Sequence, residues 1–297
     1  MRARLVLDAI DEEPMASAAL KLISWNCNQK PASWSKAAEH GADVLLLQEA
    51  TPGPVPSGLR VVAPDLECPW QTGGSKSKPW CTAVAVREGV QAKPLPLAAL
   101  DTAKADELRV SRAGSLAAAE LSLPNEGPII VISIYALWEK PVRARAGDWI
   151  YADASAHRIV SDLSALIRRQ SGHRLLVAGD WNILRGYGEH GSQYWRARYE
   201  TVFARMDALG LRLVGPFAGR RPDPRPSELP IDSDTTPTYW PPGGQPTRQL
   251  DFVFASAELA TRIRVTALNG SSWTHDHCPI DIELSPRPSG HMPSRST

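Results

Sequence analysis

Residues 175–182 join a strand pattern to a pair of polar side chains, and this combination constrains the chain most strongly. Four apolar residues, Leu175 to Ala178, are followed by Gly179, and then by Asp180 and Asn182. Residues i and i+2 of an extended segment point to the same side, so the carboxylate and the carboxamide leave the strand end together. Such a pair can hold a water molecule beside an anionic oxygen, as phosphate ester hydrolysis requires. Because Gly-Asp also begins many ordinary turns, the interpretation needs support from elsewhere.

Polar residues end other apolar strand patterns along the chain. Rigid scaffolds place catalytic groups at strand ends along one rim of a sheet. The further clusters are Trp25-Asn26-Cys27-Asn28, Gln48-Glu49, Ser133-Ile134-Tyr135, Leu250-Asp251-Phe252 and His275-Asp276-His277. Together they supply carboxylates, amides, a phenol, and a histidine beside an aspartate. The joint content of these clusters is less easily explained as ordinary turns than any one cluster alone.

The hydrophobic pattern predicts one strand-rich domain with a few helices in the middle of the chain. Strands are expected near 21–26, 43–49, 59–62, 82–87, 116–121, 129–135, 175–178, 250–254, 263–267 and 279–283. Ser33 to His40 suits a short helix with Ser33 as its N-cap, and apolar stripes at helical spacing cover 159–167 and 199–209. Trp181 alternates with its polar neighbours, so we expect it in the core between the sheets. We expect an extension over 1–19, a single domain over 20–285 and a tail without fixed structure over 286–297.

Composition and charge exclude some classes of function. The net charge of +1 gives no global positive field, so a polyanion site has to be local or neutralised by a metal. The four cysteines lack paired spacing and are expected to be buried free thiols in a reducing cytoplasm. The N-terminal residues are not a convincing signal peptide, and no stretch approaches the ~20 apolar residues of a membrane span. We therefore expect a cytoplasmic protein without membrane contact; no obligate protein partner can be read.

Five stretches, in order, resemble the endonuclease/exonuclease/phosphatase superfamily, which includes exonuclease III-like enzymes, pancreatic-type deoxyribonucleases, sphingomyelinases and inositol polyphosphate phosphatases. They span Leu22 to Leu284 and read Ile-Ser-Trp-Asn26, Leu-Leu-Gln-Glu49, Gly-Asp180-Trp-Asn182, Leu-Asp251-Phe-Val-Phe and Asp276-His277-Cys-Pro-Ile. The resemblance implies an α/β fold, a four-layer αββα sandwich of two packed mixed β-sheets flanked by helices. It also implies a divalent cation, usually Mg²⁺, for which Mn²⁺ can substitute.

The resemblance further implies roles for individual residues. Glu49, Asn28 and Asp276 match positions near the metal, although Asn28 is equally typical of a turn. Asn26, Asn182 and His277 match positions that bind the phosphate. Asp180 would orient or deprotonate the attacking water, and Asp251 would orient the imidazole of His277 and favour its protonated form. The expected reaction is in-line attack on phosphorus without a covalent intermediate.

Tyr135 distinguishes branches of this superfamily, because exonuclease III-like members carry a tyrosine about here and other branches usually carry a histidine. A tyrosine buried at a strand end for packing alone is the equal alternative. Abasic endonucleases usually follow this tyrosine with Pro-Asn, whereas this chain has Ala136-Leu137-Trp138. Asn28 also replaces the aspartate common in repair enzymes. Both departures argue against specificity for abasic sites.

Basic and aromatic residues near these motifs could form a substrate rim. They combine phosphate contact with base stacking, although each alone is more often a solvated surface residue. The candidates are Lys76, Lys78, Trp138, Lys140, Arg143, Arg145 and Arg185. The loop over 219–236 is rich in proline, arginine and aspartate, and its role cannot be read from the sequence.

Three functions are compatible with these residues. A metal-dependent nuclease acting on DNA, or less readily on RNA, is favoured by Tyr135 and the local basic and aromatic segment. A phosphatase or phosphodiesterase for a small molecule or lipid head group is favoured by the near-neutral charge. A non-catalytic binding module on the same scaffold is disfavoured, because every matched catalytic position holds a competent residue.

Overall fold

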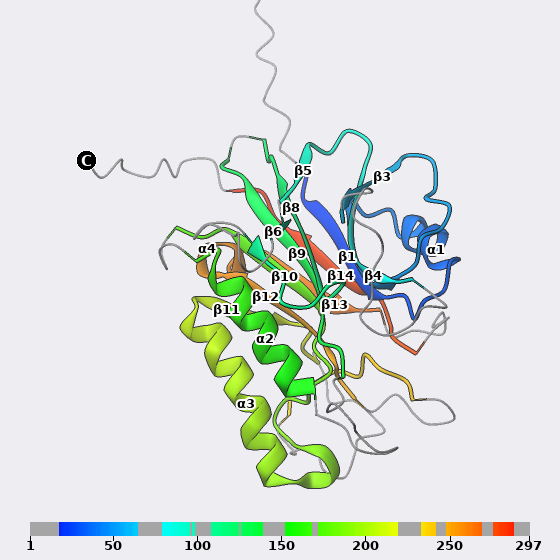
Figure 1. Ribbon diagram of the computed structural model, residues 1–297. Helices are drawn as coiled ribbons and strands as arrows, with labels where there is room; N and C mark the ends of the chain where they lie inside the picture. The colour runs from blue at the N-terminus through cyan, green and yellow to red at the C-terminus, as the bar shows by residue number, and fades with distance from the viewer. Residues whose placement is uncertain are drawn as a thin grey trace, which may run out of the picture.

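A computed structural model describes most of the chain, and Figure 1 shows the arrangement of its elements. The described residues are 18–64, 79–95, 97–98, 108–124, 126–138, 152–167, 172–218, 233–241, 248–268 and 276–287. Two six-stranded sheets form the centre. Each contains both parallel and antiparallel neighbours, so both are mixed sheets.

The first sheet has the strand order β13-β14-β1-β2-β4-β3. Its strands are β1 (Leu20–Asn26), β2 (Val44–Ala50), β3 (Leu59–Ala63), β4 (Cys81–Arg87), β13 (Ile263–Ala267) and β14 (Ile280–Leu284). The second sheet has the order β11-β12-β10-β9-β8-β5. Its strands are β5 (Ala92–Pro94), β8 (Leu116–Leu121), β9 (Ile129–Tyr135), β10 (Leu175–Asp180), β11 (Leu211–Gly215) and β12 (Asp251–Ser256). Two short strands, β6 (Leu97–Ala98) and β7 (Leu108–Arg109), pair with each other.

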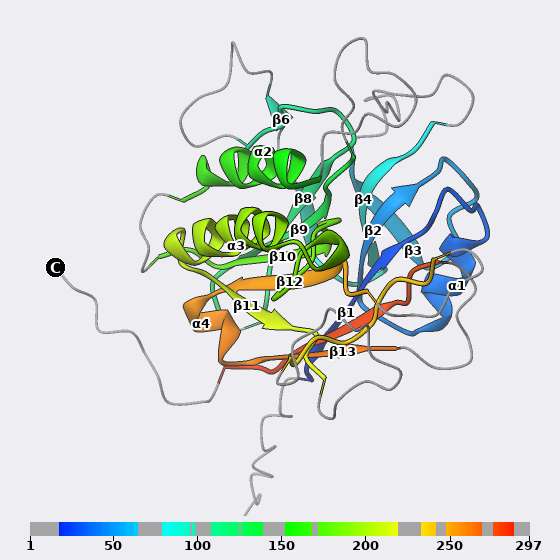
Figure 2. The ribbon, with the colours of Figure 1, turned by 90° about the horizontal axis from the view of Figure 1, so that it is seen from below.

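Helices cover the outer faces of the two sheets. Figure 2 shows α2 and α3 side by side over the second sheet, and α1 on the far side of the first sheet. The helices are α1 (Ser33–Glu39), α2 (Ala152–Ser164), α3 (Gln193–Ala208) and α4 (Ala257–Ala260), with a 3-10 turn at Glu189–Gly191. None of the helices in the described ranges is long and apolar enough to cross a membrane.

Alternation along the strands produces three hydrophobic layers. In β1, Leu22 packs between the sheets while Ile23 packs on the α1 side. In β10, Leu176 lies between the sheets while Val177 packs on the side of α2 and α3. Successive strand residues point to opposite faces, so a strand buried on both faces reads as a continuous apolar run. The expected four-layer αββα sandwich is confirmed.

Two local predictions were wrong. The first helix begins at Ser33, and Ala32 occupies the capping position without a side-chain cap. The hydroxyl of Ser33 instead donates a hydrogen bond to the carbonyl of Cys27 at 3.3 Å. Trp181 lies in the cluster beneath α2 and α3, with its ring centroid 5.0 Å from that of Phe254. Asp180 points toward the first sheet, so the residue after it points the other way.

Candidate active site

The candidate site lies where the ends of three strands of the second sheet meet the first sheet. Tyr135 ends β9, Asp180 ends β10 and Asp251 begins β12, and the pairing register places all three in one row. Residues directly opposite each other on neighbouring strands point to the same face. In the first sheet, Asn26 ends β1 opposite Gln48, with Glu49 following in β2. The row therefore faces Asn26 and Glu49.

Asn26 joins the two sheets at this point. Its side-chain Nδ2 donates to Asp180 Oδ2 at 3.0 Å and to Glu49 Oε1 at 3.2 Å. Its Oδ1 accepts the backbone N–H of Asn28 at 2.9 Å, which fixes the orientation of the amide. Asn26 and Asp180 are 154 residues apart and almost fully buried. One amide thus holds two carboxylates from different sheets side by side.

Asn182 makes further hydrogen bonds to Asp180. Its backbone N–H donates to Asp180 Oδ1 at 2.9 Å, and its Nδ2 donates to Asp180 Oδ2 at 3.2 Å and to the carbonyl of Ala136 at 3.1 Å. The side chain is only partly buried, so its amide lies at the edge of the site. Asp180 is therefore held by two asparagines, one at the end of β1 and one in the segment that follows β10.

His277 is positioned between two buried aspartates. Its Nδ1 lies 2.9 Å from Asp251 Oδ2, and its Nε2 lies 3.6 Å from Asp180 Oδ2. Burial alone lowers the pKa of His277, but the negative charges of Asp251 and Asp180 outweigh it and raise the pKa to about 10. The imidazole is therefore held in its protonated form, with Asp251 fixing its orientation.

Burial dominates the protonation of the other groups. Burial raises the pKa of Asp180 to about 8, and the nearby charge of Asp251 adds to this, while His277 acts in the opposite direction. The pKa of Tyr135 is raised well above its usual value by burial and by the charges of Glu49 and Asp180. Glu49 and Asn182 lie close enough to the Tyr135 hydroxyl to shift its pKa in opposite directions. Tyr135 is therefore a neutral group beside Glu49, Asp180 and Asn182.

The backbone is strained around the site. Asn28, Glu49 and Asn182 adopt φ values of 44°, 46° and 52°, a left-handed conformation that L-residues rarely adopt. Such strain costs of order 1–3 kcal/mol per residue and persists where the surroundings impose it, commonly at functional sites. Two of these positions, Glu49 and Asn182, carry side chains that take part in the hydrogen bonds around Asp180 and Asn26.

Residues that sequence reasoning missed support His277 and Glu49. Thr238 Oγ1 accepts the backbone N–H groups of Leu250 and Asp251, and its carbonyl accepts that of Cys278. The Tyr239 ring lies with its centroid 5.0 Å from that of His277. No signal marks them, because their segment is proline-rich and reads as a loop.

Two further contacts also escaped prediction. Trp25 Nε1 donates to the carbonyl of His277 at 2.9 Å, and Gln29 Nε2 donates to Glu49 Oε2 at 2.8 Å. Both residues lie within or next to the strand-end cluster that contains Asn26 and Asn28. Inspection of the neighbours of that cluster could have suggested them.

Several features of the site fit a divalent cation. Buried carboxylates outnumber the imidazolium, and burial raises the pKa of Asp180, so added positive charge would favour its ionised form. Among the described residues, the buried Asp276 Oδ1 has no hydrogen-bond partner. Carboxylate and amide oxygens are the donors that Mg²⁺ prefers.

Two groups of side chains are candidates for holding such an ion. In the described part of the chain, the one group of His, Cys, Asp and Glu ligand atoms within 4.8 Å of one another belongs to Asp180, Asp251 and His277. A protonated imidazole cannot ligate a metal, and His277 Nδ1 is already bonded to Asp251. We therefore favour the carboxylate of Glu49 as the metal ligand. It accepts a hydrogen bond from the same Asn26 amide as Asp180 does.

The structure brings together most of the predicted site residues, and their roles stay predictions. Asn26, Glu49, Tyr135, Asp180, Asn182, Asp251 and His277 form one connected group. Asn28 and Asp276 adjoin it, and Asn28 contacts Asn26 through its backbone N–H.

The predicted substrate rim is only partly described. Lys76, Lys78, Lys140, Arg143 and Arg145 lie outside the described residues. Trp138 is 42% exposed. Arg185 forms a bidentate ion pair with Asp234, with distances of 2.6 and 3.1 Å, and lies over the ring of Phe217.

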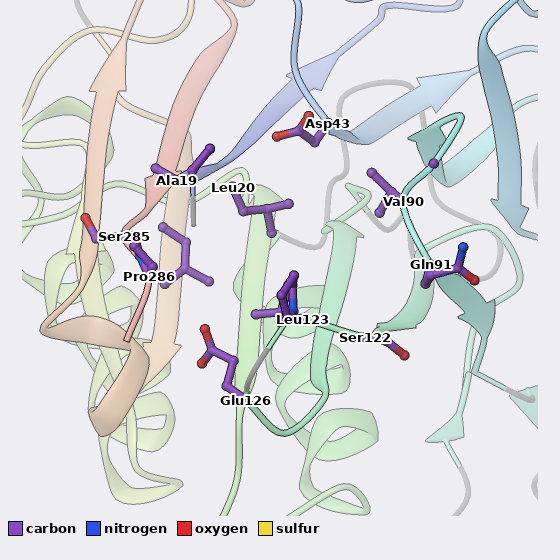
Figure 3. A pocket seen from close by; sticks show the side chains of 14 residues that line it. Ala19, Leu20, Asp43, Val90, Gln91, Ser122, Leu123, Glu126, Ser285 and Pro286 are labelled. Carbon is purple, nitrogen blue, oxygen red and sulfur yellow. The ribbon is translucent and has the colours of Figure 1, made fainter. Parts of the chain in front are cut away.

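An apolar pocket at the other end of the sandwich does not contribute to this site. Figure 3 shows its lining, which includes Leu20 at the start of β1. The seven residues of β1 put Leu20 about 20 Å from Asn26. The pocket has a volume of about 560 Å³, and its carboxylates are already bonded, Asp43 by the N–H of Lys21 and Glu126 by Arg262.

Comparison with known proteins identifies similar folds. A family model described as the Endonuclease/Exonuclease/phosphatase family matches residues 23–272. Among curated proteins, no sequence matches significantly. The chain is similar in structure to the AP endonuclease LMAP of Leishmania major, with 16% identity, a TM-score of 0.61, and coverage of 96% of this chain and 93% of that one.

Two other solved structures match over a similar share of the chain. One is a 3' phosphatase, NExo from Neisseria, bound to a product DNA hairpin, with 18% identity, a TM-score of 0.53, and coverage of 90% and 99%. The other is the endonuclease domain of a telomere-specific non-LTR retrotransposon, with 17% identity, a TM-score of 0.55, and coverage of 90% and 99%. At these identities the likeness establishes the fold.

Proposed function

The chain belongs to the endonuclease/exonuclease/phosphatase family, and from this premise we propose that it is a divalent-metal-dependent nuclease that hydrolyses phosphodiesters in DNA. The observation that carries the proposal is the Asn26 bridge, which sets the Asp180 and Glu49 carboxylates side by side within reach of His277. The three solved structures are of two endonucleases and a 3' phosphatase bound to a DNA hairpin, which supports a nucleic-acid substrate.

Each polar side chain has a part in this reaction. Asp180, in its ionised form, accepts a proton from the attacking water and orients it toward phosphorus. The protonated His277 donates from Nε2 to a phosphoryl oxygen as negative charge develops, and Asp251 holds the ring for this task. Asn182, at the edge of the site, donates to a second phosphoryl oxygen. Tyr135 positions Glu49 and Asn182 through its hydroxyl.

The cofactor would be held by Glu49, with Asp276 supplying a further oxygen donor. When bound, Mg²⁺ or Mn²⁺ neutralises charge on the phosphate and stabilises the transition state. The carboxylate of Glu49 is held by Gln29 and Asn26 through hydrogen bonds, which keeps its oxygens in place before any ion arrives.

A small-molecule phosphodiesterase or phosphatase is the second candidate. The near-neutral net charge favours it, because a protein that tracks a long polyanion usually has a positive surface. The described surface near the site also holds Arg185 in an ion pair with Asp234, which reduces the local positive charge available to a nucleic acid.

The test is hydrolysis of a substrate panel by the full chain. The panel contains supercoiled plasmid, linear duplex, single-stranded DNA, abasic duplex, RNA and small phosphate esters, each with Mg²⁺, with Mn²⁺ and with EDTA. Metal-dependent cutting of DNA, with an affinity that falls steeply as salt rises, is expected. Hydrolysis of the small esters alone would instead favour the second candidate, a small-molecule phosphodiesterase or phosphatase.

A further inference from the structure

The exposed aromatic side chains gather at the end of the sandwich that holds Asp180. Across the described ranges, the exposed large hydrophobic residues are Trp138, Tyr194, Phe217 and Trp240, with exposed fractions of 42%, 61%, 42% and 41%. A surface that exposes aromatic rings beside a candidate site is more informative than scattered apolar residues.

Strand directions place three of these residues at that end. Trp138 follows β9, which is parallel to β10 and ends beside Asp180. Phe217 follows β11, which runs in the same direction as β10 because both are antiparallel to β12. Tyr194 lies at the start of α3, in the connection that leaves Asp180 and returns to the beginning of β11. The fourth residue, Trp240, is tied directly to the site.

Trp138 is connected to the site through its own chain segment. It lies three residues beyond Tyr135, which is at most about 10 Å of backbone. The two residues between them are fixed, because Leu137 N–H donates to the carbonyl of Tyr135 at 3.1 Å and the carbonyl of Ala136 accepts from Asn182. The indole is thus carried on a segment that is bonded to two site residues.

Trp240 is connected on the side of His277. Its backbone N–H donates to the carbonyl of Asp276 at 2.6 Å. The preceding residue, Tyr239, pairs with His277 across an antiparallel bridge and packs its ring against the imidazole. Trp138 and Trp240 are therefore attached to the two sides of the same group, one beside Tyr135 and one beside His277.

We propose that Trp138 and Trp240 stack on unpaired bases next to the scissile phosphate, so that the enzyme prefers single-stranded DNA or frayed ends to continuous duplex. This inference rests on the proposed nuclease function. Every base has a π-face on which an indole can stack, but in a duplex these faces are covered by neighbouring base pairs.

The test compares two single strands of the same length on the full-length protein with Mg²⁺. One carries ordinary bases, and the other carries tetrahydrofuran residues, which lack bases, on both sides of a single cleavage position. A duplex of the ordinary strand is the third substrate. The proteins are the wild type, Trp138→Ala, Trp240→Ala and the conservative variants Trp138→Phe and Trp240→Phe, with KM and kcat measured separately.

The wild type should cleave the ordinary strand with a lower KM than either other substrate. Each alanine variant should raise KM for the ordinary strand by about five- to 100-fold and leave the baseless strand unchanged, because a stacked base contributes about that factor. The phenylalanine variants should recover most of the loss. Alanine variants with wild-type KM on the ordinary strand would overturn the stacking inference alone. Failure of the wild type to cleave any strand would overturn the nuclease function and the inference with it.

Discussion

The pairing of His277 with Asp251 is the strongest single-residue feature of the site. A buried imidazole 2.9 Å from one carboxylate and 3.6 Å from another is stabilised in its charged form and fixed in direction. A histidine that acts alone would need neither aspartate. The arrangement implies that Asp251 acts through His277, as a positioning residue, and does not contact the phosphate itself.

The effects of substituting His277 and Asp251 on kcat should therefore not add. His277→Ala and Asp251→Ala should each lower kcat by about 10²–10⁴-fold, the range typical of a lost acid–base group. The double variant should be little worse than His277→Ala, because residues that act as a unit are not additive. Steady-state kinetics on one DNA substrate, with circular dichroism as the control for folding, provides the measurement. Multiplying effects in the double variant would show that Asp251 has a separate role.

At the scale of elements, the contact between β9 and β10 sets the position of Asp180. Gly179 has φ of 153°, and a Cβ atom built there would lie 2.0 Å from the carbonyl oxygen of Ile134. The glycine therefore allows the two strands to approach closely at the point where Tyr135 and Asp180 face each other. Any side chain at this position would force the strand ends apart.

We expect Gly179→Ala to lower the free energy of unfolding by about 3 kcal/mol or more and to reduce activity with it. Gly53→Ala is the matched control, because its Cβ would meet Trp34 at 3.6 Å, an ordinary contact distance. Urea unfolding of both variants and the wild type measures the difference. Equal stability of Gly179→Ala and Gly53→Ala would contradict the close-approach argument.

Elements were more predictable from the sequence than the contacts between them. The strands β8, β9 and β13 have the predicted bounds, because apolar or alternating patterns mark each of them in the sequence. The prediction placed Trp181 on the wrong face of the second sheet, because periodicity does not show to which face the Asp180 side chain points. The contact of Asn26 with Asp180 spans 154 residues, and only the family resemblance suggested it. Thr238 and Tyr239 were missed because a proline-rich segment gives no periodic signal.

At the scale of the molecule, an ion-pair cluster joins the sheets at the end opposite the site. The side chain of Glu126 is 6% exposed and pairs with both Arg262 and Arg174, and Glu258 pairs with the same two arginines. Burial alone would raise the pKa of Glu126, but the two guanidinium groups outweigh it and hold the pKa below its usual value. A depressed carboxyl pKa contributes stability above the unfolded pKa and loses it as pH falls through the folded pKa.

Glu126→Gln should therefore lower the free energy of unfolding at pH 7 by about 2–3 kcal/mol, the value of hydrogen bonds to charged groups. The deficit should shrink as pH falls below the unfolded carboxyl pKa of about 4.3 and through the lower folded-state pKa, where the wild-type carboxyl becomes protonated. Urea unfolding across this range provides the measurement. Glu120→Gln, which breaks the exposed pair with Lys93, should change stability by about 0.5 kcal/mol or less. A deficit that stays constant with pH would exclude the ion-pair explanation.

The central claim is that Asp180, Glu49 and His277 form one metal-dependent hydrolytic site. It is tested most directly by single-turnover cleavage of one DNA oligonucleotide across a Mg²⁺ titration, with the wild type, Asp180→Asn and Glu49→Gln. We predict that Asp180→Asn loses at least about 100-fold in rate at every Mg²⁺ concentration, as expected for a lost general base. Glu49→Gln should need more Mg²⁺ to reach its maximal rate. Wild-type rates in Asp180→Asn, or wild-type cleavage in EDTA, would contradict the account.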